Sequence, residues 1–164
     1  MMLMSMPLTK TAAAPPRTLI ADDQPDVLEA LRLLLKGELK DGIAYNTEHG
    51  VPNIEIDVNG QKVKTDIDSG SPALVSLPLS LAKSLTLSSE PRVVGKGRTM
   101  DGEFDVYAAP LKGEIRIGSI ILKDPQIDMV SVFPVGNIGF QFLRTLNITF
   151  DPANRRVRFE KSKT

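Results

Sequence analysis

The stretch TDIDSGSPALVSLP, residues 65–78, decides how the rest of the chain is interpreted. Polar and apolar residues alternate up to Asp68. A hydroxyl, a glycine, a second hydroxyl and a proline follow before the next apolar run. The pattern predicts a strand that ends at Asp68 and turns sharply through Gly70, because glycine allows close backbone approach and an unusual φ. A carboxylate fixed at the end of a rigid strand is suited to chemistry, and an ordinary surface turn is the plainer alternative.

The surrounding sequence is typical of a mainly β domain. NIEIDV (53–58) and KVKTDID (62–68) alternate at period two, and the Asn-Gly pair between them is a strong hairpin signal. Residues 78–85 and 140–146 have helical spacing, and the second segment is predicted as the one clear short helix. Further strand-like runs lie at 91–95, 103–109, 113–122, 126–132, 147–151 and 155–160. Short strands separated by Gly, Pro and Asp indicate a closed sheet, either a barrel or a sandwich.

The first part of the chain has a different pattern. Residues 1–16 contain methionines and an alanine cluster but no basic segment before a long apolar stretch, so we expect a disordered leader rather than a signal peptide. Residues 17–42 predict a short strand and an amphipathic helix, with Asp23 or Gln24 as its cap. We therefore expect three parts, namely the leader, this βα extension and a main domain over 43–164.

Composition excludes several functions. Lys and Arg (20) balance Asp and Glu (20), so the zero formal charge gives no electrostatic case for binding nucleic acid or an anionic membrane. The chain has no cysteine and one histidine, His49, which excludes disulfides, thiol chemistry and sites that need two histidines from one chain. No apolar run approaches about 18 residues, so no transmembrane helix is expected. We expect no metal, no cofactor and a cytoplasmic location, with a periplasmic or secreted location left open.

The segment LIADDQPDVLEALRLLL (19–35) resembles the opening of a bacterial response-regulator receiver domain. The resemblance implies that Asp22 and Asp23 stand where that family binds magnesium, although two adjacent aspartates are more often a solvated helix start. A receiver also needs a phosphoacceptor aspartate on a later strand and a lysine near the end of its sheet. The βα pattern stops near residue 40, so we interpret residues 17–40 as a fragment, which argues against a signalling function.

From about residue 43 to residue 160 the chain resembles retropepsin-like aspartic proteases, and the family's segments occur in order. A strand pair joined by VNG leads into DIDSGSPALVSLP, and LAKSLTL follows as a helix. The hairpin GKGRTMDGEFDVYAAPL (95–111) stands where the flap would be. EIRIGSIILKDPQIDMV and NIGFQFLRTLNITFDPANRRVRFE then match the strands after the flap and the closing segment. The resemblance implies a closed acid-protease barrel with one short C-terminal helix.

The resemblance also implies an aspartic endopeptidase, in which two carboxylates activate a water. Two carboxylates that lie close together cannot both ionise, so the pair shares a proton. The chain has a single Asp-Ser/Thr-Gly motif, formed by Asp68, Ser69 and Gly70, and one copy supplies only half of the pair. The implied partner is therefore a second copy of the chain, in a homodimer, and the implied substrate is a peptide or protein.

The same resemblance implies supporting roles for other residues. Ser69 takes the place of the family's usual threonine and would brace the loop across the two subunits, while the Ser71 hydroxyl would bond to Asp68. The segment Asn137, Ile138 and Gly139 would pass beneath the loop, with Ile138 and Gly139 as structural support. The flap residues implied to face the substrate are Thr99, Met100, Asp101 and Gly102.

Simpler interpretations of the chain and of two of its segments stay open as alternatives to a protease. A binding or dimerisation module could keep the protease fold without useful turnover, since serine replaces threonine in the motif and Pro72 is unusual there. The segment MDG (100–102) could be the turn of an unrelated hairpin. RRVRFEKSK (155–163) is basic but lacks an aromatic-rich face, so we predict an edge strand with solvated charges. The distance between two Asp68 carboxylates in a dimer would distinguish a protease from a module.

Overall fold

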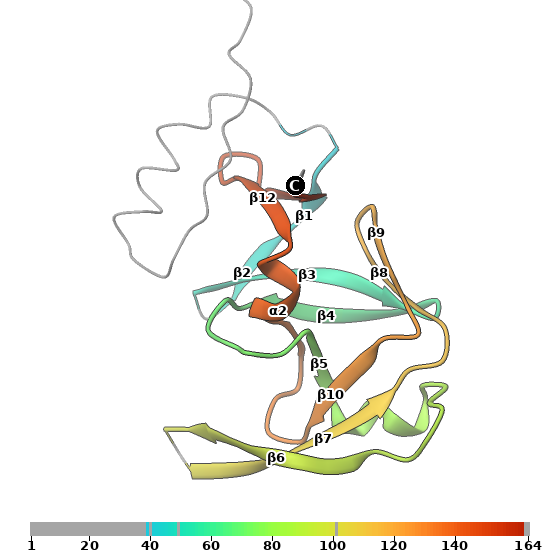
Figure 1. The fold of residues 1–164 in the computed structure, drawn as a ribbon. Coiled ribbons are helices and arrows are strands. Elements are labelled where there is room, and N and C mark those ends of the chain that lie inside the picture. The colour runs from blue at the N-terminus through green and yellow to red at the C-terminus, as the bar shows by residue number, and fades with distance from the viewer. Residues whose placement is uncertain (1–38, 40, 49, 101, 163–164) are drawn as a thin grey trace, which may run out of the picture.

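The computed structural model describes residues 39, 41–48, 50–100 and 102–162, which form a β-rich unit with two short helical segments (Figure 1). The predicted leader and βα extension lie outside the described residues, apart from the last few residues of the extension. The strands are β1 (Ile43–Ala44), β2 (Asn46–Glu48), β3 (Val51–Val58), β4 (Gln61–Ile67), β5 (Val75–Pro78), β6 (Arg92–Thr99), β7 (Gly102–Pro110), β8 (Glu114–Ile117), β9 (Ile120–Lys123), β10 (Gln126–Val130), β11 (Gly136–Ile138), β12 (Leu146–Asp151) and β13 (Arg156–Lys161). The helical segments are the 3-10 helix η1 (Leu79–Lys83) and the α-helix α2 (Phe140–Leu143).

The strands form two hydrogen-bonded sheets. The small sheet has the order β1-β13-β12, and the large sheet runs β6-β7-β10-β5-β11-β4-β3-β8-β9, with β2 beside β3. Within the described residues the large sheet is an open path, so the closed barrel predicted from the sequence is not formed. Each end of the path is a hairpin, β6–β7 or β8–β9, whose outer strand pairs only with its own hairpin partner. Figure 1 shows these two hairpins in separate parts of the molecule.

The predicted Asn-Gly hairpin is confirmed, and it determines which face of the sheet is buried. β3 and β4 are antiparallel neighbours joined by Asn59 (φ 52°) and Gly60 (φ 86°). Positive φ at both central residues is what a tight two-residue hairpin turn requires. Ile54, Ile56 and Val58 of β3 are buried, while the alternate positions of the strand face the other side.

Several elements differ in length from the sequence prediction. The run 113–122, predicted as one strand, is the β8–β9 hairpin, because the chain reverses at Gly118 (φ 59°). The segment 78–85 forms only η1, and the segment 140–146 contains only the short α2. The other predicted runs each contain a strand. None of the helical segments in the described part of the chain is long and apolar enough to cross a membrane.

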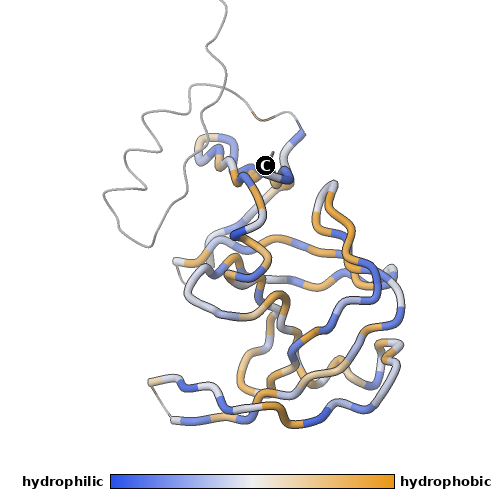
Figure 2. Tube along the Cα trace, viewed as in Figure 1, coloured by the Kyte–Doolittle hydropathy of each residue, from blue (hydrophilic) through white to orange (hydrophobic). Residues whose placement is uncertain are grey.

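One apolar core joins the two sheets. Figure 2 shows apolar residues recurring along the central strands, with polar residues between them. Removing this apolar surface from water is the main term that stabilises such a fold. β4, β5 and β11 each turn one set of alternate side chains toward the core, and their other set includes polar residues. The largest fully buried side chains include Ile56, Leu77, Leu111, Ile115, Ile117, Ile127, Met129 and Ile138.

The residues just before β1 pack against the small sheet. Leu39 is 3 % exposed, and its backbone N–H donates a hydrogen bond to Asp151 Oδ2 at 3.0 Å. Arg156 Nη1 donates to the backbone oxygen of Gly42 at 2.6 Å. These contacts join the end of the predicted extension to β12 and β13.

Candidate active site

Asp68 lies where the chain leaves the large sheet. β4 ends at Ile67, and the Asp68 N–H still donates to the backbone oxygen of Ile138 at 3.0 Å. A tight loop follows, in which the Ser71 N–H donates to the Asp68 carbonyl oxygen at 3.2 Å. The Asp68 backbone is therefore fixed by the last hydrogen bond of a central strand pair, and the predicted strand end is confirmed.

Two donors from different parts of the chain hold the Asp68 carboxylate. The Gly70 N–H donates to Oδ1 at 2.9 Å, and the Asn137 side-chain Nδ2 donates to Oδ2 at 3.0 Å. A Cβ on residue 70 would lie 3.1 Å from Oδ1, so glycine allows this close approach. Gly70 does not have a positive φ, however, so the unusual φ predicted from the sequence is wrong. Asp68 is half-buried, whereas Ser69 and Gly70 are exposed.

Ile138 and Gly139 pass directly behind the loop, as the sequence predicted. β11 pairs parallel with β4 and antiparallel with β5, and Ile138 is fully buried. A Cβ on residue 139 would meet the backbone oxygen of Ala73 and lie 2.8 Å from that of Ser71. The Phe140 N–H donates to the Ser71 oxygen at 2.7 Å. The backbone of this segment therefore holds the loop after Asp68 in place.

The Ser71 hydroxyl does not take the predicted place beside the Asp68 carboxylate. Its Oγ accepts a hydrogen bond from the Ala73 N–H at 3.4 Å, and Asn137 donates to the Asp68 oxygen instead. The sequence analysis places Asn137 beneath the loop but misses its contact with Asp68, because that contact joins residues 69 positions apart and depends on the parallel pairing of β11 with β4. A polar residue directly before the two predicted support residues, in an otherwise apolar segment, is the signal that could have found it.

Asn137 belongs to a row of polar side chains that crosses the large sheet. The strand registers place each member beside the next on one face, because side chains at paired positions point the same way. Burial raises the pKa of the Asp128 carboxyl at one end of the row above its usual value. Asp66 lies two positions before Asp68 on the same side of the chain. This polar row consists of Asn53, Asp66, Asn137, Ser76 and Asp128, on β3, β4, β11, β5 and β10.

The β6–β7 hairpin carries the residues predicted to face a substrate. Thr99 pairs with Gly102 at its tip, where Gly102 has a φ of 141°. Met100 is fully exposed, and Asp101 lies outside the described residues. The structure confirms the hairpin, and the substrate role of its tip stays a prediction.

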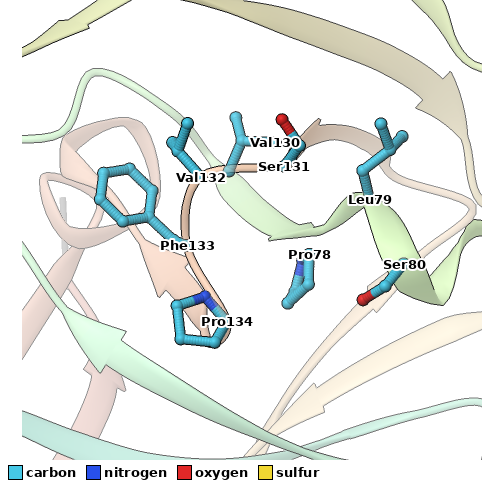
Figure 3. Close-up of a pocket in the computed structure, with 8 residues that line it drawn as sticks. All are labelled: Pro78, Leu79, Ser80, Val130, Ser131, Val132, Phe133 and Pro134. Atoms are coloured by element: carbon cyan, nitrogen blue, oxygen red, sulfur yellow. The ribbon is translucent and has the colours of Figure 1, made fainter. Parts of the chain in front are cut away.

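An apolar pocket lies on the same sheet face as the polar row. Pro78 on β5 pairs with Val130 on β10, two residues beyond the pair that ends the row. Phe104 of β7 packs edge-on against Phe133, with 5.8 Å between ring centroids, so the hairpin reaches the pocket. Figure 3 shows the lining residues, which are Pro78, Leu79, Ser80, Val130, Ser131, Val132, Phe133 and Pro134.

The chemistry available at this site is that of a carboxylate. Asp68 can act as a base when ionised or as an acid when protonated, toward a water or a carbonyl oxygen. Its two hydrogen bonds fix the orientation in which it does so. In the part of the chain that the structure describes, no three His, Asp or Glu side chains gather closely enough to hold a metal ion.

Comparison with models of protein families shows which family the chain belongs to. A family model described as aspartyl protease matches residues 54–142, which is more than half of the 164 residues and includes Asp68 and Asn137. The chain belongs to the aspartyl protease family. The family match leaves out the receiver-like segment 17–40. No curated protein matches the chain.

Solved protease structures share the fold of this aspartyl protease family member. A retropepsin-like aspartic protease from Rickettsia conorii aligns with a TM-score of 0.55 and 18 % identity, over 71 % of this chain and 95 % of that protein. The EIAV protease, solved in complex with the inhibitor HBY-793, aligns with a TM-score of 0.50 and 17 % identity, over 62 % of this chain and 92 % of that one. At these identities the likeness concerns the fold alone, and it confirms the retropepsin-like fold.

Proposed function

We propose that this aspartyl protease family member is an aspartic endopeptidase whose active site is completed by two copies of the chain. The proposal rests on Asp68, the carboxylate of the chain's single Asp-Ser-Gly motif, which is held at the end of a central strand with both oxygens hydrogen-bonded. One carboxylate cannot be base and acid at once, so a second Asp68 must face the first. Ser69 and Gly70 are exposed in the single chain and are the residues that a second copy would cover.

The proposed reaction uses the shared proton of the pair. The ionised Asp68 removes a proton from a water, and the water oxygen attacks the carbonyl carbon of the peptide bond. The protonated Asp68 of the second copy donates to the carbonyl oxygen, so charge does not build up there. As the tetrahedral intermediate collapses, one of its two hydroxyls returns a proton to the second Asp68, the C–N bond breaks, and the leaving nitrogen takes the proton that came from the water. The products are a free carboxyl group and a free amine.

The surroundings of Asp68 support an extended peptide as substrate. The apolar pocket beside the polar row can accept an apolar side chain. The β6–β7 hairpin reaches that pocket through the Phe104–Phe133 contact, and its tip carries the exposed Met100. A peptide between the hairpin and Asp68 would therefore be held from both sides.

Cleavage of a mixed peptide library at several pH values, with the full chain and with Asp68→Asn, tests this function. Asparagine keeps the size of the side chain but cannot act as the base, so we expect cleavage to fall by about 1,000-fold or more. Asp57→Asn is the matched control. Asp57 lies at the far end of β3, where its Oδ1 accepts from the Gly60 N–H, and an asparagine oxygen can keep that bond.

Inhibition by a statine-like peptide, which mimics the tetrahedral intermediate, is the second readout. Equal cleavage by the parent and by Asp68→Asn would show that the activity comes from another protein. A pure protein that dimerises but never cleaves would instead support the binding-module interpretation.

A further inference from the structure

We propose that Asn137 is a positioning residue for the reaction, which holds the Asp68 carboxylate in one plane through its side-chain amide. This inference rests on the proposed protease function. It goes beyond that function because it assigns a role to a residue that belongs neither to the Asp-Ser-Gly motif nor to the flap.

Asn137 binds the Asp68 carboxylate oxygen that the Asp-Ser-Gly motif does not bind. The Gly70 N–H, two residues away, holds Oδ1 at 2.9 Å, and Asn137 Nδ2 holds Oδ2 at 3.0 Å. Rotation of the carboxylate about its Cβ–Cγ bond would break both hydrogen bonds. A single donor on Oδ1 would leave the position of Oδ2 less restricted.

Asn137 is itself held rigidly. It lies at the centre of β11, which is hydrogen-bonded to β4 on one side and to β5 on the other. Its neighbours in the strand, Gly136 and Ile138, are buried. A side chain on such a strand can fix the group it touches more closely than a side chain on a loop.

The remaining amide atom also indicates function rather than packing. Asn137 Oδ1 is buried and has no hydrogen-bond partner among the described residues. A buried polar atom without a partner is unfavourable, and a leucine of similar size would avoid it. The contact with Asp68 is what an asparagine offers here and a leucine does not.

A neutral amide is also suited to a pair of carboxyl groups that share one proton. Nδ2 donates to Asp68 when that group is ionised, and after a rotation of the amide Oδ1 can accept from Asp68 when it is protonated. A lysine or arginine could serve only the ionised form. Asn137 of each copy can therefore match whichever state its own Asp68 adopts.

Two acidic residues share this face with Asp68. Asp66 pairs with Asn137 across β4 and β11, and Asp128 lies beyond Ser76 on β10. The hydroxyl groups of Ser69 and Ser71 lie in the loop after Asp68. Among the described residues of the polar row and this loop no basic side chain is present, so the donors on Asp68 are the neutral groups of Gly70 and Asn137.

The test compares kcat and KM for the parent, Asn137→Leu and a matched control, Asn53→Leu, at the pH of highest activity. Asn53 is a buried asparagine of the same polar row, two strands away from Asn137, and within the described residues the hydrogen bonds to the Asp68 carboxylate come from Gly70 and Asn137, not from Asn53. We expect Asn137→Leu to lower kcat by about 10- to 100-fold with KM changed less than about twofold. Asn53→Leu should leave both constants near the parent values. An unchanged kcat in Asn137→Leu would overturn the proposal.

A second variant separates positioning from packing through its pH profile. Asn137→Asp keeps the shape of the side chain, but its carboxyl donates a hydrogen bond only when protonated. We expect its activity relative to the parent to rise as the pH falls, whereas Asn137→Leu should show no such rise. The same pH dependence in both variants would contradict the proposal.

A measurement that does not depend on peptide cleavage tests the role of Asn137 separately from the proposed protease function. The 13C signal of the Asp68 side-chain carboxyl in labelled full-length protein should move in Asn137→Leu and stay in place in Asn53→Leu. If the parent does not cleave any peptide, the protease proposal fails, and this signal still decides whether Asn137 holds Asp68. An Asp68 signal that is the same in the parent and in Asn137→Leu would overturn the inference.

Discussion

Asp68 is a half-buried carboxylate whose two oxygens accept hydrogen bonds from groups 2 and 69 residues away. The near donor, the Gly70 N–H, follows from the motif and could be predicted, because glycine is the residue that lets the backbone approach so closely. The far donor, Asn137, has a sequence signal in its place beside the predicted support residues, but its contact with Asp68 depends on which strand lies beside β4, and no local pattern says that. Single residues therefore set the chemistry, and the pairing of strands brings them together.

The half-buried Asp128 gives a pH-dependent prediction. Burial raises its pKa in the folded protein above the usual value of 3.8. At pH values between 3.8 and this raised pKa, the folded state therefore binds more protons than the unfolded chain. The free energy of unfolding therefore falls as the pH rises through the folded-state pKa. Asp128→Asn removes this penalty and should stabilise the protein at pH 7 by a few tenths to about 1 kcal/mol, because the side chain is only partly buried.

Urea unfolding of the parent and Asp128→Asn between pH 3 and pH 8 measures this effect. The difference should be largest at neutral pH and should shrink toward the acid end. Asp105→Asn, at an exposed ion pair with Lys96, is the control and should change stability by less than about 0.5 kcal/mol. A loss of stability in Asp128→Asn at pH 7 would show that its carboxylate makes a favourable contact in the folded protein.

The elements could be predicted where their signal is local. The β3–β4 hairpin was found because Asn59 and Gly60 favour the positive φ that its turn needs. The sequence prediction misses the β8–β9 hairpin because it extends one strand through Gly118 and Ser119, although a Gly-Ser pair between two apolar runs is itself a turn signal.

Longer-range features could not be derived from these patterns. The strand-like runs that contain β6 and β9 do not say whether these two strands pair with each other to close a barrel. Ser71 was expected at the Asp68 carboxylate because it is close in sequence, yet Asn137 from β11 takes that place. The order of strands in the sheet decides both outcomes.

The segment before β1 leads to a prediction about the extent of the folded unit. Asp151 is 1 % exposed and accepts hydrogen bonds from the Leu39 N–H and from Asn154, while Leu39 is itself buried. Burial alone would raise the pKa of Asp151, but these hydrogen bonds outweigh it and hold the pKa below the usual value. We therefore propose that the unit includes Leu39 rather than starting at residue 43.

Two shortened proteins, beginning at Leu39 and at Ile43, test this extent in thermal and urea unfolding. The first should be as stable as the full chain. The second should lose about 2 to 4 kcal/mol, because a buried leucine is removed and a buried carboxylate loses a donor. Since Asp151 has a lowered pKa, the stability it gives is present above pH 3.8 and is lost as the pH falls through its folded-state pKa, so the gap between the two proteins should narrow in acid. Equal stability at neutral pH would place the start of the unit after residue 42.

At the scale of the whole molecule, the fold presents one face on which several features meet. Asp68, the polar row and the apolar pocket share this face, and the β6–β7 hairpin reaches the pocket. One chain supplies one motif carboxylate, and its loop is exposed at Ser69 and Gly70. The proposed protease is therefore complete only as a pair, and its activity per chain should fall on dilution below the dissociation constant of the dimer.

Subunit mixing tests the central claim, that two copies of Asp68 form one active site. Parent protein at a fixed concentration is equilibrated with increasing amounts of Asp68→Asn, and peptide cleavage is measured at each ratio. Mixed dimers carry only one carboxylate, so random pairing predicts that an equal amount of the variant reduces cleavage to about one half, and a ninefold excess to about one tenth. Cleavage that stays constant at every ratio would show that a single chain holds a complete site, which would contradict the account.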